Sequence, residues 1–415
     1  AMEVFSIELM ASFLLYQLVF YYLIYYNKMK KKNIVILGST GSIGKTLINI
    51  LEKDKNNFKI SLLSANKNYK ELLSQAKRFQ VKNVIITDKD IFLKIKKNLK
   101  NNNIKIFNDF TCFDKVFKNQ KIDYTMSAIS GLSGLKPTLN IIKFTKNIAL
   151  ANKESIICGW PLIVKNLKKF NTNFIPVDSE HFSILSLIDK NKSNIEKLFI
   201  TASGGPFNKY PLKKFKSITP KLALNHPNWK MGKKITIDSA TMMNKVFEII
   251  EAKKIFDIDY KKLIILVHPK SYVHAIVKFS NGLTKILIHD TSMSIPIFNS
   301  LYLNSKKSIQ SQKLNLNKLN NLDFQKIDYK RFPVVKILNL LPQNHSLFET
   351  VIVSANDKLV DLFLKKKNTF NNISFFLLKI TEMHEFQKFK KINVKDVDQI
   401  VKLSDYVSLK IENLA

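Results

Sequence analysis

Three carboxylates are the side chains of this chain that most clearly suggest chemistry. Asp178 and Glu180 lie two residues apart in the segment PVDSEH, and Glu248 lies further along, in DSATMMNKVFE. Residues two apart in an extended segment face one side, so Asp178 and Glu180 are expected to point together. Three carboxylates without a histidine or cysteine cluster suit a hard divalent ion, and we predict Mg²⁺ or Mn²⁺, with Co²⁺ as a further candidate. The alternative is that Asp178 caps a helix and that both glutamates are surface charges.

The segment around Glu248 also carries groups that bind anions. Ser239 precedes a predicted helix on which four side chains share one face at i, i+3, i+4 and i+7 spacing: Thr241, Asn244, Lys245 and Glu248. A hydroxyl, an amide and an ammonium group predict a phosphate pocket, which Ser203 in the turn ASGGP and His226 would complete. The alternatives are an exposed Lys245–Glu248 pair, worth about a few tenths of a kcal/mol, and a histidine that is merely packed.

Two further segments would line such a pocket. In ANKES, Lys153 follows a predicted strand at the sheet edge where ligands bind, so it could contact a substrate hydroxyl or carbonyl group. Asn152 and Glu154 would then face a cofactor. In HPNWKMG, Trp229 and Met231 look exposed, which is typical of a loop that closes over a ligand. The alternative for Lys153 is an ordinary surface lysine.

A glycine-rich turn near the start of the chain predicts a nucleotide site. Residues 38–44, GSTGSIG, follow a predicted strand at Ile34–Leu37 and open a predicted helix at Ile43–Leu51. Such a turn lets the backbone approach a pyrophosphate, and the helix N-terminus attracts its charge. The second strand ends in LLSANKN, without the acidic residue that binds the ribose of NAD. Asn66, Lys67 and Asn68 could instead hold a 2′-phosphate, which favours NADP. The alternatives are a tight turn without a ligand and a surface lysine at 67.

Alternating strands and helices over the first part of the chain predict an α/β fold with an N-terminal Rossmann-like, doubly wound parallel sheet. The expected strands there are Ile34–Leu37, Ile60–Leu63, Val84–Ile86, Tyr124–Ala128 and Ile148–Leu150. From Phe174 the pattern shifts to strands that end in polar motifs, which predicts a central α+β catalytic domain. Its expected strands are Phe174–Val177, Leu198–Ala202, Lys234–Ile237, Leu263–Val267 and Val273–Phe279. Apolar stripes near the end predict a C-terminal helical bundle.

These patterns divide the chain into five segments. We expect an apolar N-terminal extension at 1–28, an NADPH-binding domain at 29–176 and a catalytic metal- and substrate-binding domain at 177–303. A linker rich in Asn and Lys at 304–333 then leads to a C-terminal helical domain at 334–415.

The composition argues against nucleic acid as the partner. The chain has 67 basic and 32 acidic residues, and the net charge of +35 invites a nucleic-acid interpretation. All the basic residues except Arg78 and Arg331 are lysines, however, and they are spread along the whole chain. Nucleic-acid readers rely on arginine for bidentate and stacking contacts. The only two cysteines, Cys112 and Cys158, form no CxxC pair, which fits a reducing, cytoplasmic compartment.

The beginning of the chain has two interpretations. Val4–Tyr26 is almost continuously apolar and long enough to span a bilayer, and the lysines after it would leave the rest in the cytoplasm. Alternatively, Met29 is the natural start, because MKKKNIVILGSTG is a common beginning for a soluble dinucleotide-binding enzyme. We favour this upstream extension. A cleavable signal is disfavoured because no basic residues precede the apolar run. Membrane association is expected only if the segment is retained.

Six ordered motifs resemble those of the 1-deoxy-D-xylulose 5-phosphate reductoisomerase family: GSTGSIG, ALANKES, PVDSEH, SGGPF, HPNWKMG and DSATMMNK. The similarity runs from about Lys32 to the C-terminus. It implies a homodimeric, NADPH- and metal-dependent enzyme of the non-mevalonate isoprenoid pathway that phosphonohydroxamates inhibit. Members of the family isomerise the sugar phosphate and reduce the aldehyde intermediate to 2-C-methyl-D-erythritol 4-phosphate.

The resemblance implies a role for each residue at these motifs. The implied metal ligands are Asp178, Glu180 and Glu248, which with Lys153 are the implied catalytic residues. The implied substrate contacts are Lys153, Ser179, Glu180, Ser203, His226, Ser239, Asn244, Lys245 and Glu248. The implied cofactor contacts are Thr40, Gly41, Ser42, Ile43, Asn66, Lys67, Asn68, Asn152, Glu154 and Gly232. The implied lid residues are Trp229 and Met231.

The chain departs from the family pattern at two places. Val246 and Phe247 stand where the family usually has Gly-Leu, so crowding could shift the helix and weaken phosphate affinity. Asn66 stands where a small residue is common and could alter the adenosine fit. A competing interpretation is a semialdehyde dehydrogenase, which needs a catalytic cysteine, but Cys158 has no histidine nearby in the sequence.

Overall fold

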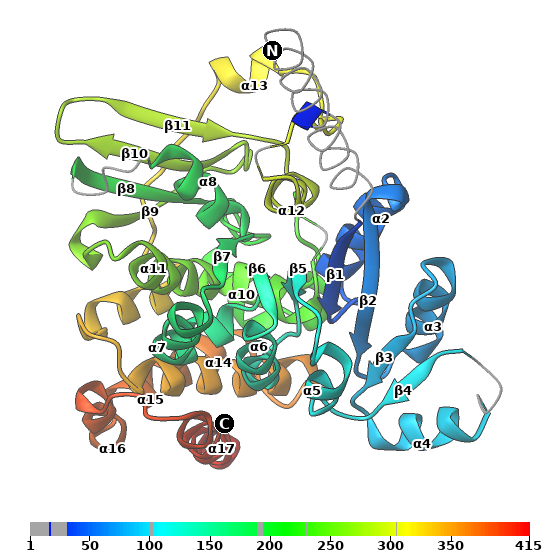
Figure 1. Cartoon of the computed structure of the whole chain (residues 1–415). Helices are drawn as coiled ribbons and strands as arrows, with labels where there is room; N and C mark the ends of the chain where they lie inside the picture. The colour runs from blue at the N-terminus through cyan, green and yellow to red at the C-terminus, as the bar shows by residue number, and fades with distance from the viewer. Residues whose placement is uncertain (1–15, 18–30, 99–102, 189–193, 230, 304) are drawn as a thin grey trace, which may run out of the picture.

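The computed structural model describes residues 16–17, 31–98, 103–188, 194–229, 231–303 and 305–415. Over these residues the chain forms a seven-stranded sheet, a four-stranded sheet and a group of C-terminal helices (Figure 1). The apolar segment expected at 1–28 lies outside the described residues, apart from 16 and 17. None of the helices in the described part of the chain is long and apolar enough to cross a membrane.

The seven-stranded sheet is parallel throughout and has the strand order β4-β3-β2-β1-β5-β6-β7. Its strands are β1 (Lys32–Leu37), β2 (Phe58–Ala65), β3 (Asn83–Ile86), β4 (Lys105–Phe107), β5 (Ile122–Ser127), β6 (Thr145–Leu150) and β7 (Asn173–Pro176). Strand order reverses between β1 and β5, and doubly wound sheets bind ligands at such a switch point. The predicted Rossmann-like sheet is therefore confirmed.

Helices cover both faces of this sheet, which explains the buried apolar runs in strands such as β1 and β3. They are α2 (Ser42–Glu52), α3 (Tyr69–Arg78), α4 (Lys89–Asn98), α5 (Cys112–Phe117), α6 (Leu135–Ile142) and α7 (Lys153–Phe170). Only two residues separate α7 from β6, and the Asn152 side chain caps the helix by accepting a hydrogen bond from the Ser155 backbone N–H at 2.6 Å. This short connection fixes the Lys153 side chain at the carboxyl edge of the sheet.

The four-stranded sheet has the order β11-β10-β8-β9. β8 (Ile195–Ala202) runs parallel to β9 (Leu263–Val267) and antiparallel to β10 (Val273–Phe279), and β11 (Thr284–Ile288) forms one edge. The helices beside it are α8 (Ser179–Leu187), α9 (Pro220–Ala223), α10 (Lys233–Thr241), α11 (Met243–Phe256) and α12 (Ser294–Leu301). α11 packs against α7, so the second sheet is tied to the first through two helices that carry candidate site residues.

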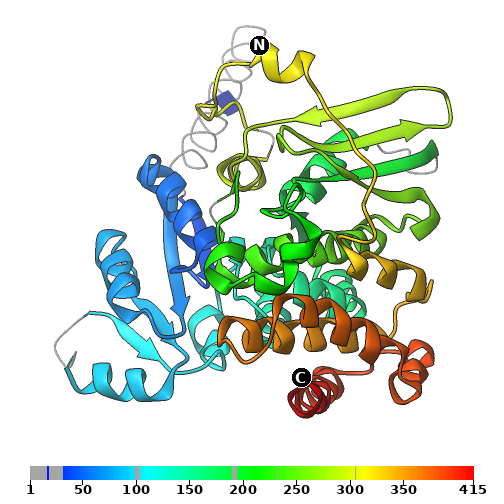
Figure 2. The same ribbon diagram turned by 180° about the vertical axis from the view of Figure 1, so that it is seen from behind.

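The C-terminal region is helical, as predicted. It contains α14 (Phe348–Leu364), α15 (Phe370–Glu382), α16 (His384–Gln387) and α17 (Val397–Leu414), preceded by a short helix α13 (Leu316–Asn320). Short 3-10 turns are η1 (Lys55–Asn57), η2 (Leu132–Gly134), η4 (Leu212–Ser217), η5 (Tyr260–Lys262), η6 (Pro333–Leu340) and η7 (Lys388–Lys391). α14 packs against α7 and α10 as well as against α15 and α17. Figures 1 and 2 show the four-stranded sheet and these helices at opposite ends of the molecule.

Three expectations about local structure are wrong. The segment Lys234–Ile237, expected as a strand, lies within helix α10, because its packing against α11 and α14 overrides the strand preference of Ile and Thr. Thr241 does not share the α11 face, since the backbone turns at Met242, with φ 73°, between the two helices. The strand expected at Phe174–Val177 pairs with β6 as β7 and belongs to the first sheet, not the second. Strands β4 and β11 were not expected from the sequence.

Candidate active site

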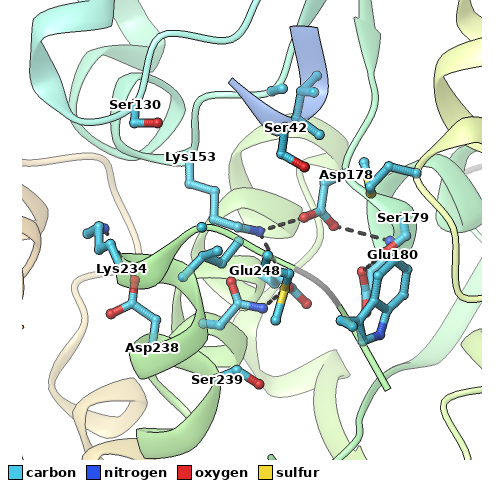
Figure 3. A pocket seen from close by; sticks show the side chains of 18 of the residues that line it. Ser42, Ser130, Lys153, Asp178, Ser179, Glu180, Lys234, Asp238, Ser239 and Glu248 are labelled. Atoms are coloured by element: carbon cyan, nitrogen blue, oxygen red, sulfur yellow. Dashed lines mark hydrogen bonds and ion pairs between the residues drawn. The ribbon is translucent and has the colours of Figure 1, made fainter. Parts of the chain in front are cut away.

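A cavity of about 430 Å³ lies where the turn after β1, the start of α7 and the helices α8, α10 and α11 converge. Eighteen of the predicted site residues line it: Gly41, Ser42, Ile43, Asn152, Lys153, Glu154, Asp178, Ser179, Glu180, Ser203, His226, Trp229, Met231, Gly232, Ser239, Asn244, Lys245 and Glu248. Figure 3 shows several of these side chains pointing toward one another. Thr40, Asn66, Lys67 and Asn68 are not among the lining residues.

The three carboxylates come together. One oxygen each from Asp178, Glu180 and Glu248 lies within 4.8 Å of the others, and Glu248 is fully buried. Asp178 and Glu180 do not lie in an extended segment as expected, since Asp178 caps α8 and accepts a hydrogen bond from the Glu180 backbone N–H at 3.1 Å. Asp178 therefore both caps a helix and faces the other two carboxylates. Three carboxylate oxygens fit Mg²⁺ or Mn²⁺.

Two lysines neutralise this carboxylate group. Lys153 Nζ lies 2.5 Å from Asp178 and 3.3 Å from Glu248. Lys245 Nζ lies 2.5 Å from Glu180 and 2.6 Å from Glu248. The alternative interpretation of Lys245 and Glu248 as an exposed surface pair is therefore wrong, since both side chains are buried. Both ammonium groups are buried, and buried charges of this kind persist only when they are paired.

Burial and charge set the protonation of these carboxylates. Burial raises the pKa of Glu248 to about 7, the nearby Glu180 carboxylate adding to the shift. Burial also opposes ionisation of Asp178, but the Lys153 ammonium outweighs it and holds the pKa of Asp178 well below its usual range. A divalent cation at this position would favour the ionised form of Glu248, since opposite charge lowers the pKa of a carboxyl group.

Polar groups on the other side of the cavity suit a phosphate. His226 Nε2 lies 3.2 Å from Ser203 Oγ and 3.1 Å from Ser239 Oγ. Asn244 donates to Glu248, while its buried Oδ1 has no hydrogen-bond partner within the described part of the chain. Hydroxyl, imidazole and ammonium donors therefore face one space, and they come from the turn after β8, the loop before α10, and the helices α10 and α11.

The tautomer of His226 follows from its partners. The backbone N–H groups of Asn228 and Trp229 donate to Nδ1 at 3.1 and 3.0 Å, so Nδ1 is unprotonated and Nε2 carries the hydrogen. Burial, together with the Lys245 charge, lowers the pKa of His226 to about 4. Imidazole thus faces the two serines as a neutral hydrogen-bond donor.

This protonation state gives the first prediction. We expect the His226 ring to remain neutral, with its hydrogen on Nε2, from pH 8 down to about pH 5, because the two backbone donors hold Nδ1 as an acceptor. Long-range ¹H–¹⁵N NMR spectra check this, with a His226→Gln variant to assign the signal. A midpoint near the ordinary value of about 6.5, or a hydrogen on Nδ1, would contradict it.

The predicted nucleotide turn has the expected shape. Gly38 has φ +82°, and a Cβ on Gly44 would overlap the Gly38 carbonyl oxygen and the Ser39 backbone. α2 starts at Ser42 with Gly41 as its N-cap residue, so the free N–H groups of the helix point to the cavity rim. The loop after β5 lies opposite, held by hydrogen bonds from the Asn152 side chain to the carbonyl oxygens of Ile129 and Gly131.

A second prediction concerns this turn. Gly44→Ala should destabilise the fold by roughly 1–3 kcal/mol and weaken NADPH binding, because the added methyl group meets backbone atoms that cannot move aside. Chemical denaturation and NADPH fluorescence titration measure both effects. Gly41→Ala is the matched control for stability, since its Cβ would lie in ordinary contact with the Gly38 carbonyl oxygen, at 3.4 Å. Wild-type stability and NADPH affinity in Gly44→Ala would show that the turn is not closely packed.

The residues expected around the 2′-phosphate lie at the end of β2. Asn68 caps α3 by accepting from the Glu71 N–H at 3.4 Å, and Asn66 donates to Thr87 Oγ1 at 2.8 Å. Lys67 is 74 % exposed and lies 3.7 Å from Asp88. The structure therefore gives Asn68 a capping role that the sequence analysis did not foresee.

The two lid residues are half-buried, not exposed as expected. The Trp229 ring meets the His274 ring edge-on at 6.2 Å, while the residue between Trp229 and Met231 lies outside the described residues. Gly232 is the N-cap residue of α10, directly after this loop. The loop is thus joined to the helix that carries Ser239.

The departures from the family pattern fall outside the cavity. Val246 and Phe247 are fully buried and do not line the cavity. Their side chains pack in the hydrophobic core instead. Cys158 is also fully buried, and burial raises the pKa of its thiol far above the usual range. A buried, protonated thiol does not serve as the nucleophile that a semialdehyde dehydrogenase requires.

Several cavity residues were not selected from the sequence. They are Lys234, Asp238, Ser271, His274 and Met293, among others. Lys234 and Asp238 are four residues apart on α10, which is a helical pairing signal, but the expectation of a strand concealed it. His274 lies near the start of β10, next to apolar residues, and gives no such signal.

Family comparisons agree with this geometry. A model described as 1-deoxy-D-xylulose 5-phosphate reductoisomerase matches residues 34–159, and one for its C-terminal domain matches residues 174–256. A third model, described as DXP reductoisomerase C-terminal domain, matches residues 289–407. Together they span well over half of the chain.

Similar proteins carry the same name. A 1-deoxy-D-xylulose 5-phosphate reductoisomerase of Pelagibacter ubique is 63% identical over 386 residues, which cover 92% of this chain and 100% of the relative. One from Wolbachia pipientis wMel is 39% identical over 388 residues, covering 92% and 96%.

Solved structures of the same name share the fold. The reductoisomerase from Zymomonas mobilis in complex with NADPH superposes with a TM-score of 0.81 at 31% identity, covering 93% of this chain and 99% of that one. A DOX-P reductoisomerase in complex with NADPH, fosmidomycin and magnesium gives a TM-score of 0.85 at 28% identity, covering 92% and 98%. The chain therefore belongs to the 1-deoxy-D-xylulose 5-phosphate reductoisomerase family.

Proposed function

We propose that this protein converts 1-deoxy-D-xylulose 5-phosphate to 2-C-methyl-D-erythritol 4-phosphate, with NADPH as reductant and Mg²⁺ or Mn²⁺ as metal, in isoprenoid precursor biosynthesis. The observation that carries the proposal is the convergence of three carboxylate oxygens, a serine–histidine–lysine pocket and a dinucleotide-type turn on one cavity. Family membership supports it, as do the NADPH and magnesium named for the solved relatives.

The substrate phosphate would lie against the polar pocket. Ser203, His226 and Ser239 would donate hydrogen bonds, and Lys245 and Asn244 would complete the contacts from α11. Binding of the phosphate would fix the orientation of the substrate, which lowers the entropic cost of rearranging its carbon skeleton. A neutral His226 suits this role, because it adds a donor and leaves the charge to Lys245.

The metal would be held by Asp178, Glu180 and Glu248. When bound, it would polarise neighbouring substrate oxygens and stabilise negative charge as the carbon–carbon bond breaks. Lys153 contacts this group and lines the same cavity, so its ammonium can donate to a substrate hydroxyl or carbonyl group. Ser179, whose hydroxyl donates to Glu180 at 2.5 Å, would orient that carboxylate and contact the substrate.

NADPH would lie across the switch point and supply the hydride. Its nicotinamide end would meet cavity residues of three segments, Gly41–Ile43, Asn152–Glu154 and Gly232, and its adenosine end would extend toward Thr40 and Asn66–Asn68. The loop with Trp229 and Met231 would close over the ligands and keep water from the aldehyde.

We assign the cofactor to 29–176, the metal and substrate to 177–303, and the remaining segments to a linker at 304–333 and a helical domain at 334–415.

NADPH oxidation tests the proposal. The loss of reduced-nicotinamide absorbance would be followed with 1-deoxy-D-xylulose 5-phosphate, in chelator-treated protein and after adding Mg²⁺, Mn²⁺ or Co²⁺. We expect oxidation that requires both substrate and metal. Folded, metal-loaded protein that binds NADPH but does not oxidise it would overturn the proposal.

We also propose a cytoplasmic homodimer. The edge strand β11 supports it, because Ile286 on that strand is 45% exposed and Leu283 before it is 57% exposed, and exposed apolar edges commonly pair with another chain. Light scattering after size exclusion tests the assembly, with Ile286→Lys as the variant expected to yield monomers. A monomeric wild-type chain would contradict it.

A further inference from the structure

One partly buried lysine joins three elements of the protein beside the cavity. Lys234 Nζ, on α10, lies 2.5 Å from Glu154 at the start of α7, 3.2 Å from Asp238 on α10 and 2.8 Å from Asp357 on α14. We call these four residues the Lys234 cluster. Asn356 of α14 adds a hydrogen bond of 2.8 Å to Asp238.

The Lys234 cluster lies in the wall of the active site. Lys234, Glu154 and Asp238 all line the cavity, and Figure 3 shows Lys234 and Asp238 beside Ser239. Asp238 directly precedes Ser239, and Glu154 directly follows Lys153. Asp357 is not a lining residue, so the C-terminal helices reach the cavity through Lys234.

The charge of the cluster is unfavourable for the ligands that this cavity would take. Three carboxylates surround one ammonium group, in a wall that must accept a sugar phosphate and a dinucleotide, both of which are anions. Glu154 and Asp238 are buried, so their charges act across a medium of low dielectric constant. The face of the Phe247 ring, whose centroid lies 5.3 Å from Lys234 Nζ, adds a further electron-rich surface around the ammonium.

We propose that Lys234 is a positioning residue that shields the anionic ligands from three neighbouring carboxylates, and that Asp357 makes the C-terminal helices part of this charge balance. The proposal rests on the proposed function for the identity of the sugar phosphate, but not for NADPH. It predicts effects of opposite sign for the lysine and the aspartate. A purely structural role predicts the same sign for both, because each substitution breaks the same ion pair.

The test compares Lys234→Gln with Asp357→Asn at pH 8, where Asp357, whose pKa burial raises to about 7, is ionised. NADPH dissociation constants come from fluorescence and the KM for the sugar phosphate from NADPH oxidation. Lys234→Gln should raise the NADPH dissociation constant and the KM roughly tenfold. Asp357→Asn should lower the same two constants about two- to threefold. The double variant should give values between those of the single variants. Lys234→Arg should restore most of the affinity.

A matched control separates charge from stability. Lys254→Gln removes a different ion-paired lysine, on α11, whose side chain is buried, whose Nζ lies 2.8 Å from Glu349 and which does not line the cavity. Its thermal stability should fall while NADPH affinity stays at the wild-type value. If Lys234→Gln does not fold, Asp357→Asn decides alone, and weaker NADPH binding in that variant would overturn the inference. Wild-type protein that binds NADPH but shows no turnover would overturn the proposed function and leave the NADPH comparison intact.

Discussion

Glu248→Gln is expected to lower kcat/KM for 1-deoxy-D-xylulose 5-phosphate by a factor on the order of 10³ or more. Glu248 lies at the centre of the carboxylate group, because Lys153, Lys245 and Asn244 all contact it. Glutamine keeps the size of the side chain but removes one of three anionic oxygen ligands. Metal affinity should therefore fall together with activity.

Steady-state kinetics at increasing Mg²⁺ or Mn²⁺, with calorimetric metal titration, measure both quantities. Glu251→Gln is the matched control, since Glu251 is equally buried on the same helix and lies 3.5 Å from Lys153, but does not line the cavity. Its metal affinity should stay close to that of the wild type. Unchanged metal affinity and turnover in Glu248→Gln would mean that the metal lies elsewhere.

Lys245→Met should separate substrate binding from metal binding. Removing the ammonium should raise the KM for the sugar phosphate about 100-fold or more, the order expected when one partner of a buried charge contact is lost. Metal affinity should be kept or increase, because Lys245 no longer competes for Glu180 and Glu248, which it contacts at 2.5 and 2.6 Å. A loss of substrate affinity without a loss of metal affinity distinguishes this role from general damage.

The same variant has a predicted effect on stability. Without Lys245 two buried carboxylates lose a partner, so the metal-free protein should lose roughly 3 kcal/mol, and added Mg²⁺ should restore part of the loss. Denaturation with and without Mg²⁺ measures this. Lys253→Met is the control, because it removes a lysine of the same helix that pairs with the exposed Asp257. Equal losses of phosphate and metal affinity in Lys245→Met would contradict the account.

The sequence predicted most of the fold because its signals are local. β1 is an apolar run followed by glycines, and such a run is buried on both faces of a parallel sheet wherever it occurs. The motifs of the candidate site lie where strands end and helices begin, at Asn152 before α7 and at Asp178 before α8. Since the carboxyl ends of parallel strands share one edge, these short motifs also converge in space.

Other features depend on contacts between distant segments. The run Ile235-Thr-Ile237 favours a strand by composition, and only its packing against α14 and α11 makes it a helix. The Asp357 contact with Lys234 joins residues more than 100 positions apart, and one aspartate in a helical stripe carries no sign of it. Asp178 shows that two interpretations can hold at once, since it caps α8 and also lies within the carboxylate group.

The most direct test of the central claim follows a label from the cofactor into the product. Wild-type protein would be given 1-deoxy-D-xylulose 5-phosphate, Mg²⁺ and NADPH with deuterium at its transferable position, and the product analysed by NMR and mass spectrometry. We predict a branched product with deuterium on the hydroxymethyl carbon that does not bear the phosphate, because reduction follows rearrangement of the carbon skeleton. An unbranched product with deuterium on the carbon next to its methyl group would reveal direct reduction of the ketone and contradict a reductoisomerase.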